Sequence, residues 1–299
     1  MQNDEVFYRL VWLNRIFFVS LLKILLSSQN NIEMKYSIIT INYNNADGLR
    51  RTIESVVNQT YTDYEYLIID GGSSDGSVNA IKDYEDKISY WVSEKDGGIY
   101  NAMNKGVKVA HGEYLIFMNS GDFFYDSDVL KNISKELYNE DVLVGKVFIY
   151  GTNNIISPPP QRELSMYHLF SGSIPHQGTF IKTTLQKKYP FDEALRISSD
   201  WKFFLQTIIF DNCNIKFSNL PVAIYDNNGI SSNNPTAMRF EKEQILSEYL
   251  PQRVILDYKY MKQCECLTQT LTPQLRKSYR VDKLLYLIGK LLLKINNRQ

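Results

Sequence analysis

The sequence is poor in cysteine and has no excess of charge of either sign. Three cysteines occur among 299 residues, and Cys264 and Cys266 form a single C-x-C pair with no second pair or histidine cluster near it. This excludes a disulfide scaffold and argues against a zinc site, so ordinary thiols in the reducing cytoplasm are expected. Lysine plus arginine and aspartate plus glutamate each total 33, which argues against a protein that coats nucleic acid.

The sequence also lacks an uninterrupted apolar run of the roughly 18 residues that a membrane-spanning helix needs. Its nearest candidate, residues 10–26, contains four polar or charged residues. Asp4 and Glu5 stand where a secretory signal peptide would be basic. We therefore treat residues 1–33 as an apolar or amphipathic N-terminal extension; because Met34 precedes the first strand-like run, an upstream start codon is the alternative explanation.

From residue 35 onward, strand-like and helix-like patterns alternate. The first strand-like runs cover residues 36–41, 64–69, 88–93 and 113–118. Apolar residues at helical spacing separate them. This order predicts an α/β fold with a mainly parallel sheet wrapped by helices.

Polar clusters follow all four of these runs. They occupy residues 42–45, 70–75, 93–98 and 119–122. In such sheets ligands bind beyond the carboxyl ends of the strands, so we predict that the four clusters form one site. Further along the chain, residues 142–150 and 179–182 have strand character and residues 199–210 have helical character.

The charge is unevenly distributed along the chain. Residues 274–299 contain seven basic residues and one acidic residue, a net charge of +6, which leaves −6 on the first 273 residues. The basic residues fall on one helical stripe and leucine and isoleucine on the other side. Within a helical C-terminal region, residues 236–299, this predicts an amphipathic helix that binds an anionic membrane surface. Docking of the same helix on the catalytic domain or on a partner is the alternative.

Four segments, in order and spacing, closely resemble the nucleotide-sugar-binding half of family-2 glycosyltransferases, which have the GT-A fold. They are SIITINYNN, IIDGGSSDGS, SEKDGGIYNAMNKG and HGEYLIFMNSGD. The later segments SIPHQGTFIKT and FDEALRISSDWKFFLQ are similar to the acceptor half. The resemblance covers roughly residues 35–230 and implies a catalytic domain at 34–235, divided into donor and acceptor halves at 34–125 and 126–235.

The resemblance implies five residues that bind the nucleotide sugar. Tyr43 would stack on the nucleobase. The alternative is that it is an aromatic residue at the end of a strand that packs against the protein itself. Asp70 would accept a hydrogen bond from the base or ribose, although many relatives have two adjacent acids where this chain has Asp70 and Gly71. Asp96 is a second candidate for the nucleoside pocket, and Asn104 and Lys105 would lie near the diphosphate.

A metal site is implied at Asp122, where the family places its D-x-D motif. A carboxylate at this position would hold Mg2+ or Mn2+ against the diphosphate, since these cations prefer oxygen ligands. In this chain the motif is Asn119-Ser120-Gly121-Asp122, so an amide has replaced the first acid. The alternative is that Asp122 caps the following helix.

The family's catalytic base corresponds to Asp200, which would take the proton from the acceptor hydroxyl. His176 and Gln177 would line the same cleft and contact the diphosphate or the acceptor, and Trp201 would lie beside them. A helix N-cap is the alternative role for Asp200.

The resemblance therefore predicts an inverting enzyme of bacterial surface-polysaccharide assembly, peripheral on the inner face of the cell membrane. Its donor would be a nucleotide-diphosphate sugar and its acceptor a glycan or a lipid-linked glycan. Because the Q-x-x-R-W signature of processive synthases is absent, transfer of a single sugar is expected. Two alternatives stay open: a nucleotidyltransferase or another nucleotide-sugar enzyme on a similar sheet, and a non-catalytic nucleotide-sugar-binding protein.

Overall fold

The computed structural model describes residues 34–158, 164–227 and 234–276, with side chains described up to residue 266. The expected N-terminal extension, residues 1–33, lies outside this part of the chain. Residues 277–299, which contain most of the expected basic helix, lie outside it as well.

The strands of the described residues form one mixed sheet of nine strands. They are β1 (Tyr36–Asn42), β2 (Tyr64–Asp70), β3 (Tyr90–Ser93), β4 (Tyr114–Phe117), β5 (Phe123–Phe124), β6 (Val142–Ile149), β7 (Ile155–Ile156), β8 (Thr179–Lys182) and β9 (Ile215–Tyr225). The spatial order is β3-β2-β1-β4-β8-β6-β9-β5, with β7 paired to β6. Strands β1 to β4 are mutually parallel, whereas β8 runs antiparallel to both of its neighbours.

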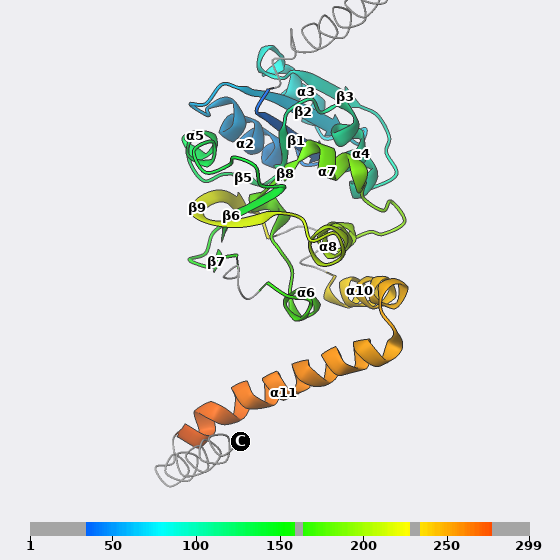
Figure 1. The fold of residues 1–299 in the computed structure, drawn as a ribbon. Coiled ribbons are helices and arrows are strands. Elements are labelled where there is room, and N and C mark those ends of the chain that lie inside the picture. Colours follow the sequence, from blue (N-terminus) through cyan, green and yellow to red (C-terminus); the bar gives the residue numbers. More distant parts are fainter. Residues whose placement is uncertain (1–33, 159–163, 228–233, 277–299) are drawn as a thin grey trace, which may run out of the picture.

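Helices cover both faces of the sheet (Figure 1). They are α2 (Ala46–Val57), α3 (Ser77–Lys82), α4 (Ile99–Val109), α5 (Val129–Ile133), α6 (Met166–Ser171), α7 (Thr183–Lys188), α8 (Ser199–Phe204), α10 (Pro235–Tyr249) and α11 (Gln252–Arg276). The described residues also form the 3-10 turns η1 (Glu85–Lys87) and η3 (His176–Gly178) and the six-residue π helix η4 (Leu205–Phe210).

Alternation along the strands divides the core into two clusters. In β1, Ile39 and Ile41 face one side, where they pack with residues of α4, α6, α8 and α10. Tyr36 and Ile38 face the other side and pack with α2, α3 and α5. Strand β1 is buried along its whole length, which explains its nearly continuous apolar sequence.

The fold predicted from the sequence is confirmed, because the expected strand runs coincide with β1, β2 and β4 and the helical patterns between them with α2, α3 and α4. The expected helix over residues 199–210 is divided into α8 and η4. The third strand is shorter than its pattern, since it begins at Tyr90.

The C-terminal helices α10 and α11 attach to the body beside α8. Glu241 of α10 accepts hydrogen bonds from the backbone N–H groups of residues 196, 197 and 198, immediately before α8. Helix α11 packs against α6, where the ring of Tyr258 stacks on that of Phe170 and Tyr167 Oη donates a hydrogen bond to Glu265. None of the described helices is long and apolar enough to cross a membrane.

Candidate active site

The carboxyl ends of the parallel strands bring the predicted polar clusters together. Asn42, Asp70 and Ser93 end β1, β2 and β3, and the strand register places Asp70 opposite the other two. Because β4 is parallel to β1, the turn at residues 119–122 lies at the same edge. The single site predicted from the four clusters therefore has its geometric basis in the strand register.

Asp70 organises the loop after β2. Its side chain is fully buried, and its two oxygens accept four hydrogen bonds, which use all the acceptor sites of a carboxylate. The donors are Asn42 Nδ2 at 2.7 Å, Ser73 N at 2.9 Å, Ser73 Oγ at 2.6 Å and Ser93 Oγ at 2.6 Å. Burial alone would raise the pKa of Asp70, but these donors lower it below its ordinary value. Direct contact with the nucleoside stays a prediction for this residue.

The side chains of Tyr43 and Asp96 both lie beside Gly71, on one side of the candidate site. A Cβ atom on Gly71 would lie 2.6 Å from Asp96 Oδ2 and 3.2 Å from Tyr43 Cδ2. The Tyr43 ring is 68% exposed, so its face is open to a planar base.

Asn104 and Lys105 of α4 already hold protein partners. The Asn104 amide donates to Phe191 O and to Glu193 and accepts from Phe191 N, thereby fixing the segment after α7. Lys105 Nζ lies 2.6 Å from Glu94 Oε1, in the loop that carries Asp96. Their predicted role near the diphosphate stays a prediction.

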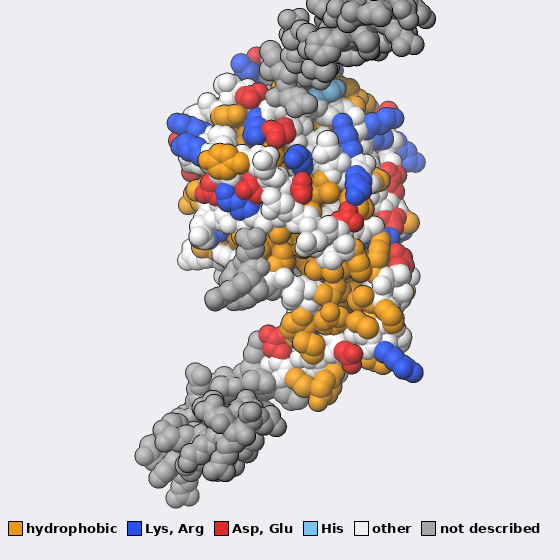
Figure 2. Space-filling model, viewed as in Figure 1, with side chains coloured by type: hydrophobic (Ala, Val, Ile, Leu, Met, Phe, Trp, Pro, Cys, Tyr) orange, Lys and Arg blue, Asp and Glu red, His pale blue; other side chains and the backbone are white. Residues whose placement is uncertain are grey.

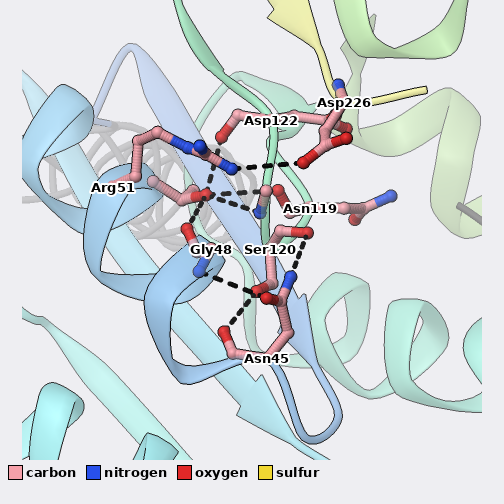
Figure 3. A network of polar contacts seen from close by, with 9 residues as sticks. Asn45, Gly48, Arg51, Asn119, Ser120, Asp122 and Asp226 are labelled. Carbon is pink, nitrogen blue, oxygen red and sulfur yellow. Dashed lines mark hydrogen bonds and ion pairs between the residues drawn. The ribbon is translucent and has the colours of Figure 1, made fainter. Parts of the chain in front are cut away.

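The turn after β4 holds Asp122 in a buried network (Figure 3). Asp122 is 5% exposed, and its Oδ1 accepts a hydrogen bond from Asp226 N at 2.9 Å. Thr52 Oγ1 donates to Asp122 O at 2.6 Å and accepts from Gly121 N at 3.0 Å, where Gly121 has a φ of +106° that favours glycine. With few donors to stabilise its charge, burial raises the pKa of Asp122 to about 7.

Arg51 and Asp226 of this network were missed by the sequence reasoning. Arg51 of α2 pairs with Asp226, the residue after β9, at 3.2 Å. Asp226 follows a strand in the same way as Asn42 and Asp70 do, and that position was a usable signal. Arg51 carried no such signal, because its partner is distant in sequence. Asn45 and Ser120, which belong to two of the predicted polar clusters, form hydrogen bonds with each other (Figure 3).

Two oxygens at this turn fit a divalent cation. Besides the Asp122 carboxylate, Asn119 Oδ1 is buried with no hydrogen-bond partner in the described structure. Both are hard ligands of the kind that Mg2+ and Mn2+ prefer. No group of three His, Cys, Asp or Glu side chains suited to a metal occurs among the described residues, so the remaining ligands would be substrate phosphates and water.

His176 links Asp200 to the Asn119 turn. Asp200 Oδ1 accepts a hydrogen bond from Tyr100 Oη at 3.0 Å, and its Oδ2 lies 3.3 Å from His176 Nδ1. On the other side of the ring, His176 Nε2 lies 3.4 Å from Asn119 Nδ2. The two side chains Asp200 and His176 are 18% and 17% exposed. Segments about 80 residues apart therefore meet in one connected chain of polar contacts.

The contact stabilises the charged forms of both partners. Burial alone would raise the pKa of Asp200, but His176 leads the contacts that lower it below its ordinary value. Burial likewise opposes the charge of His176, yet the Asp200 carboxylate raises the pKa of His176. Asp200 is thus ionised at neutral pH, the form in which a carboxylate can accept a proton.

The other two residues predicted on the acceptor side differ in their accessibility. Gln177 follows His176 in η3 and is half-buried. Trp201 is 1% exposed and donates through Nε1 to Leu169 O at 2.9 Å, so it packs in the core under Asp200. Contacts of these residues with an acceptor stay predictions.

Comparison with known proteins agrees with this geometry. The family model described as glycosyl transferase family 2 matches residues 37–208. This chain is therefore a glycosyltransferase with the GT-A fold. It belongs to family 2.

Two curated relatives illustrate the sequence similarity. An uncharacterized glycosyltransferase of Mycobacterium tuberculosis is 34% identical over 182 residues, covering 58% of this chain and 68% of the relative. A PGL/p-HBAD biosynthesis glycosyltransferase of Mycobacterium bovis is 27% identical over 228 residues, covering 74% of this chain and 88% of the relative.

Two solved structures share the fold. Staphylococcus aureus TarS 1-349 in complex with UDP-GlcNAc has a TM-score of 0.59 at 20% identity, covering 74% of this chain and 69% of that one. The mannosyltransferase PcManGT from Pyrobaculum calidifontis in complex with GDP-Man and Mn2+ has a TM-score of 0.57 at 17% identity, covering 87% and 80%.

The four hydrogen bonds of Asp70 predict a pH-dependent loss of stability in Asp70→Asn. Because the folded-state pKa of Asp70 is lowered, the stabilisation is present above its unfolded pKa of about 3.9 and is lost as pH falls through the folded value. At pH 7 we expect the free energy of unfolding of Asp70→Asn to be about 2–4 kcal/mol lower than that of the wild type. At pH 3.5 the difference should be smaller.

Urea denaturation at the two pH values measures this difference. The exposed Asp86→Asn is the matched control, and its unfolding free energy should stay near that of the wild type. A difference for Asp70→Asn that is equally large at pH 3.5 and pH 7 would contradict the role assigned to the ionised carboxylate.

Proposed function

We propose that this glycosyltransferase inverts the anomeric carbon of a nucleotide-diphosphate sugar and transfers one sugar per encounter to a glycan or lipid-linked acceptor. The observation that carries the proposal is the contact chain from Tyr100 through Asp200 and His176 to Asn119. It links a carboxylate suited to proton abstraction with the turn suited to the diphosphate. Relatives named for PGL/p-HBAD biosynthesis and structures holding UDP-GlcNAc or GDP-Man support a nucleotide-sugar donor.

In the proposed reaction Asp200 removes the proton of the acceptor hydroxyl while the hydroxyl oxygen attacks the anomeric carbon. The bond from that carbon to the diphosphate oxygen breaks on the opposite side, which inverts the configuration. Tyr100 and His176 hold the Asp200 carboxylate in one orientation through contacts with its Oδ1 and Oδ2 atoms.

On the donor side we propose that Tyr43 and Asp96 bind the nucleoside. Asp70 joins the strand ends that precede Tyr43 and Asp96 through its hydrogen bonds with Asn42 and Ser93, and it also bonds Ser73 in its own loop. Asp122 and Asn119 would hold Mg2+ or Mn2+, which supplies positive charge to the leaving diphosphate. Arg51 and Asp226 keep the Asp122 turn in place.

The decisive test of the proposed function is a transfer screen on wild type and Asp200→Asn. Nucleotide sugars are supplied with lipid-linked and soluble glycan acceptors, and released nucleotide is measured. We expect the turnover of Asp200→Asn to fall about 10²- to 10⁴-fold, since general-base catalysis contributes that much, with unchanged donor affinity. The exposed Asp257→Asn on α11 should behave as wild type. Unchanged turnover in Asp200→Asn would exclude Asp200 as the general base.

The metal proposal predicts a shift in thermal unfolding. Excess Mn2+ should raise the unfolding midpoint of the wild type by several degrees and that of Asp122→Asn by much less, because a ligand that binds only the folded state stabilises it. Since the Asp122 carboxyl must lose its proton to bind, the shift should grow as pH rises through about 7. Equal Mn2+ shifts in both proteins, with Asp257→Asn as control, would exclude Asp122 as a ligand.

We further propose that the enzyme acts on the inner face of a bacterial membrane, held there by the basic C-terminal segment. The support is the net charge of +6 on residues 274–299. Deletion of residues 275–299 should abolish co-sedimentation with vesicles that contain anionic lipid, whereas neutral vesicles should bind neither protein. Equal sedimentation of full-length and shortened chains would remove the membrane proposal.

A further inference from the structure

Lys242 of α10 is a half-buried cation beside the catalytic carboxylate. Its Nζ donates to Gly172 O at 2.9 Å and lies 4.9 Å from the centre of the Trp201 ring. Trp201 is the neighbour of Asp200 in α8, and Gly172 follows α6. Within the described residues, no carboxylate forms an ion pair with Lys242. An ammonium has three donors, so two remain for another group.

The carboxylates around Lys242 are engaged elsewhere. Glu241 holds the backbone before α8, Glu243 pairs with Lys259 at 3.0 Å, and Glu265 accepts from Tyr167 at 2.6 Å. Asp200 itself is committed to Tyr100 and His176.

A second lysine adds to the positive charge at this position. Lys262 of α11 lies 6.0 Å from the ring of Phe170, near the end of α6. Burial lowers the pKa of Lys242 to about 8; the charge of Asp200 opposes this effect and that of Lys262 adds to it. A desolvated cation without a counterion is unfavourable, so an incoming anion would be bound favourably here.

We propose that Lys242, assisted by Lys262, binds a phosphate group carried by the acceptor. The inference rests on the proposed function and specifies its acceptor class. Two lysines match the two negative charges of a phosphate better than the single charge of a carboxylate, and lysine binds phosphate as a point charge. The position beside Asp200 is on the side of the attacking hydroxyl, whereas the donor diphosphate belongs at the Asp122 turn.

Figure 2 shows apolar side chains over the region of α8, α10 and the start of α11. Helices α10 and α11 also carry the exposed apolar side chains of Phe240, Leu256, Tyr260 and Met261. Such a surface suits a phosphate joined to a hydrocarbon chain. A phosphorylated glycan presents the same anionic group without the chain, so the two sources are separated by experiment.

The test measures binding of farnesyl phosphate and glucose 1-phosphate by calorimetry, with farnesol and methyl glucoside as uncharged counterparts. Wild type, Lys242→Gln and Lys242→Arg are compared with the matched control Lys259→Gln, which removes an ion-paired lysine from the adjoining helix. We expect Lys242→Gln to weaken phosphate binding on the order of 10- to 100-fold and to leave UDP and GDP binding unchanged. Lys242→Arg should retain the binding.

A pH series provides a readout that a merely structural role would not change. Phosphate binding by the wild type should weaken as pH rises above about 8, where Lys242 loses its proton, whereas binding by Lys242→Arg should stay constant to pH 9.5. A circular dichroism melt checks that both variants are folded; if Lys242→Gln is not, the pH series on wild type and Lys242→Arg decides.

Binding of farnesyl phosphate alone supports a lipid-linked phosphate, and binding of glucose 1-phosphate alone supports a glycan phosphate.

The proposal is overturned if neither probe binds the wild type, if Lys242→Gln binds as well as wild type, or if nucleotide affinity falls together with phosphate affinity. Failure of the transfer screen with phosphate binding intact would remove the catalytic proposal only. Active transfer without any phosphate preference would remove the phosphate site only.

Discussion

The contact between Asp200 and His176 is the interaction on which the arrangement of the site depends. His176 comes from the turn before β8 and Asp200 from α8, yet the histidine ring also reaches Asn119 after β4. One imidazole thereby fixes the distance between the carboxylate proposed for the acceptor and the turn proposed for the diphosphate. Because in-line transfer requires both partners in a near-attack geometry, displacement of this ring would disturb donor and acceptor chemistry together.

Two buried aspartates show how the same side chain acquires different properties at this edge of the sheet. Asp70 and Asp122 are both withdrawn from solvent, but Asp70 receives four donors from its surroundings while the Asp122 carboxylate receives the backbone N–H of Asp226. The pKa of the first is lowered and that of the second is raised to about 7. Asp70, whose carboxylate is fully hydrogen-bonded, stabilises a loop. Asp122, whose carboxylate accepts fewer hydrogen bonds, is the proposed ligand of a cation.

Much of the donor side was predictable because it depends on local patterns. The composition of the apolar runs predicts β1, β2 and β4. Because these strands are parallel, their final residues lie at one edge of the sheet. The pairing of Arg51 with Asp226, 175 positions away, follows from packing of the whole chain, as do the places of β8 and β9 in the sheet. Gly71 looked like a missing acid in the sequence, and only the fold shows that it lies beside the Asp96 carboxylate.

The residues that could be predicted from the sequence and those that could not have different proposed tasks in the enzyme. The family match ends at residue 208, and it contains the residues proposed for the nucleotide sugar and for proton abstraction. Lys242 and the apolar residues of α11 lie beyond it, on helices attached to α8 through Glu241. These helices add no strand to the sheet whose edge is proposed for the donor. Recognition of the acceptor is therefore expected to depend on α10 and α11, where a shared catalytic domain can be adapted to different acceptors.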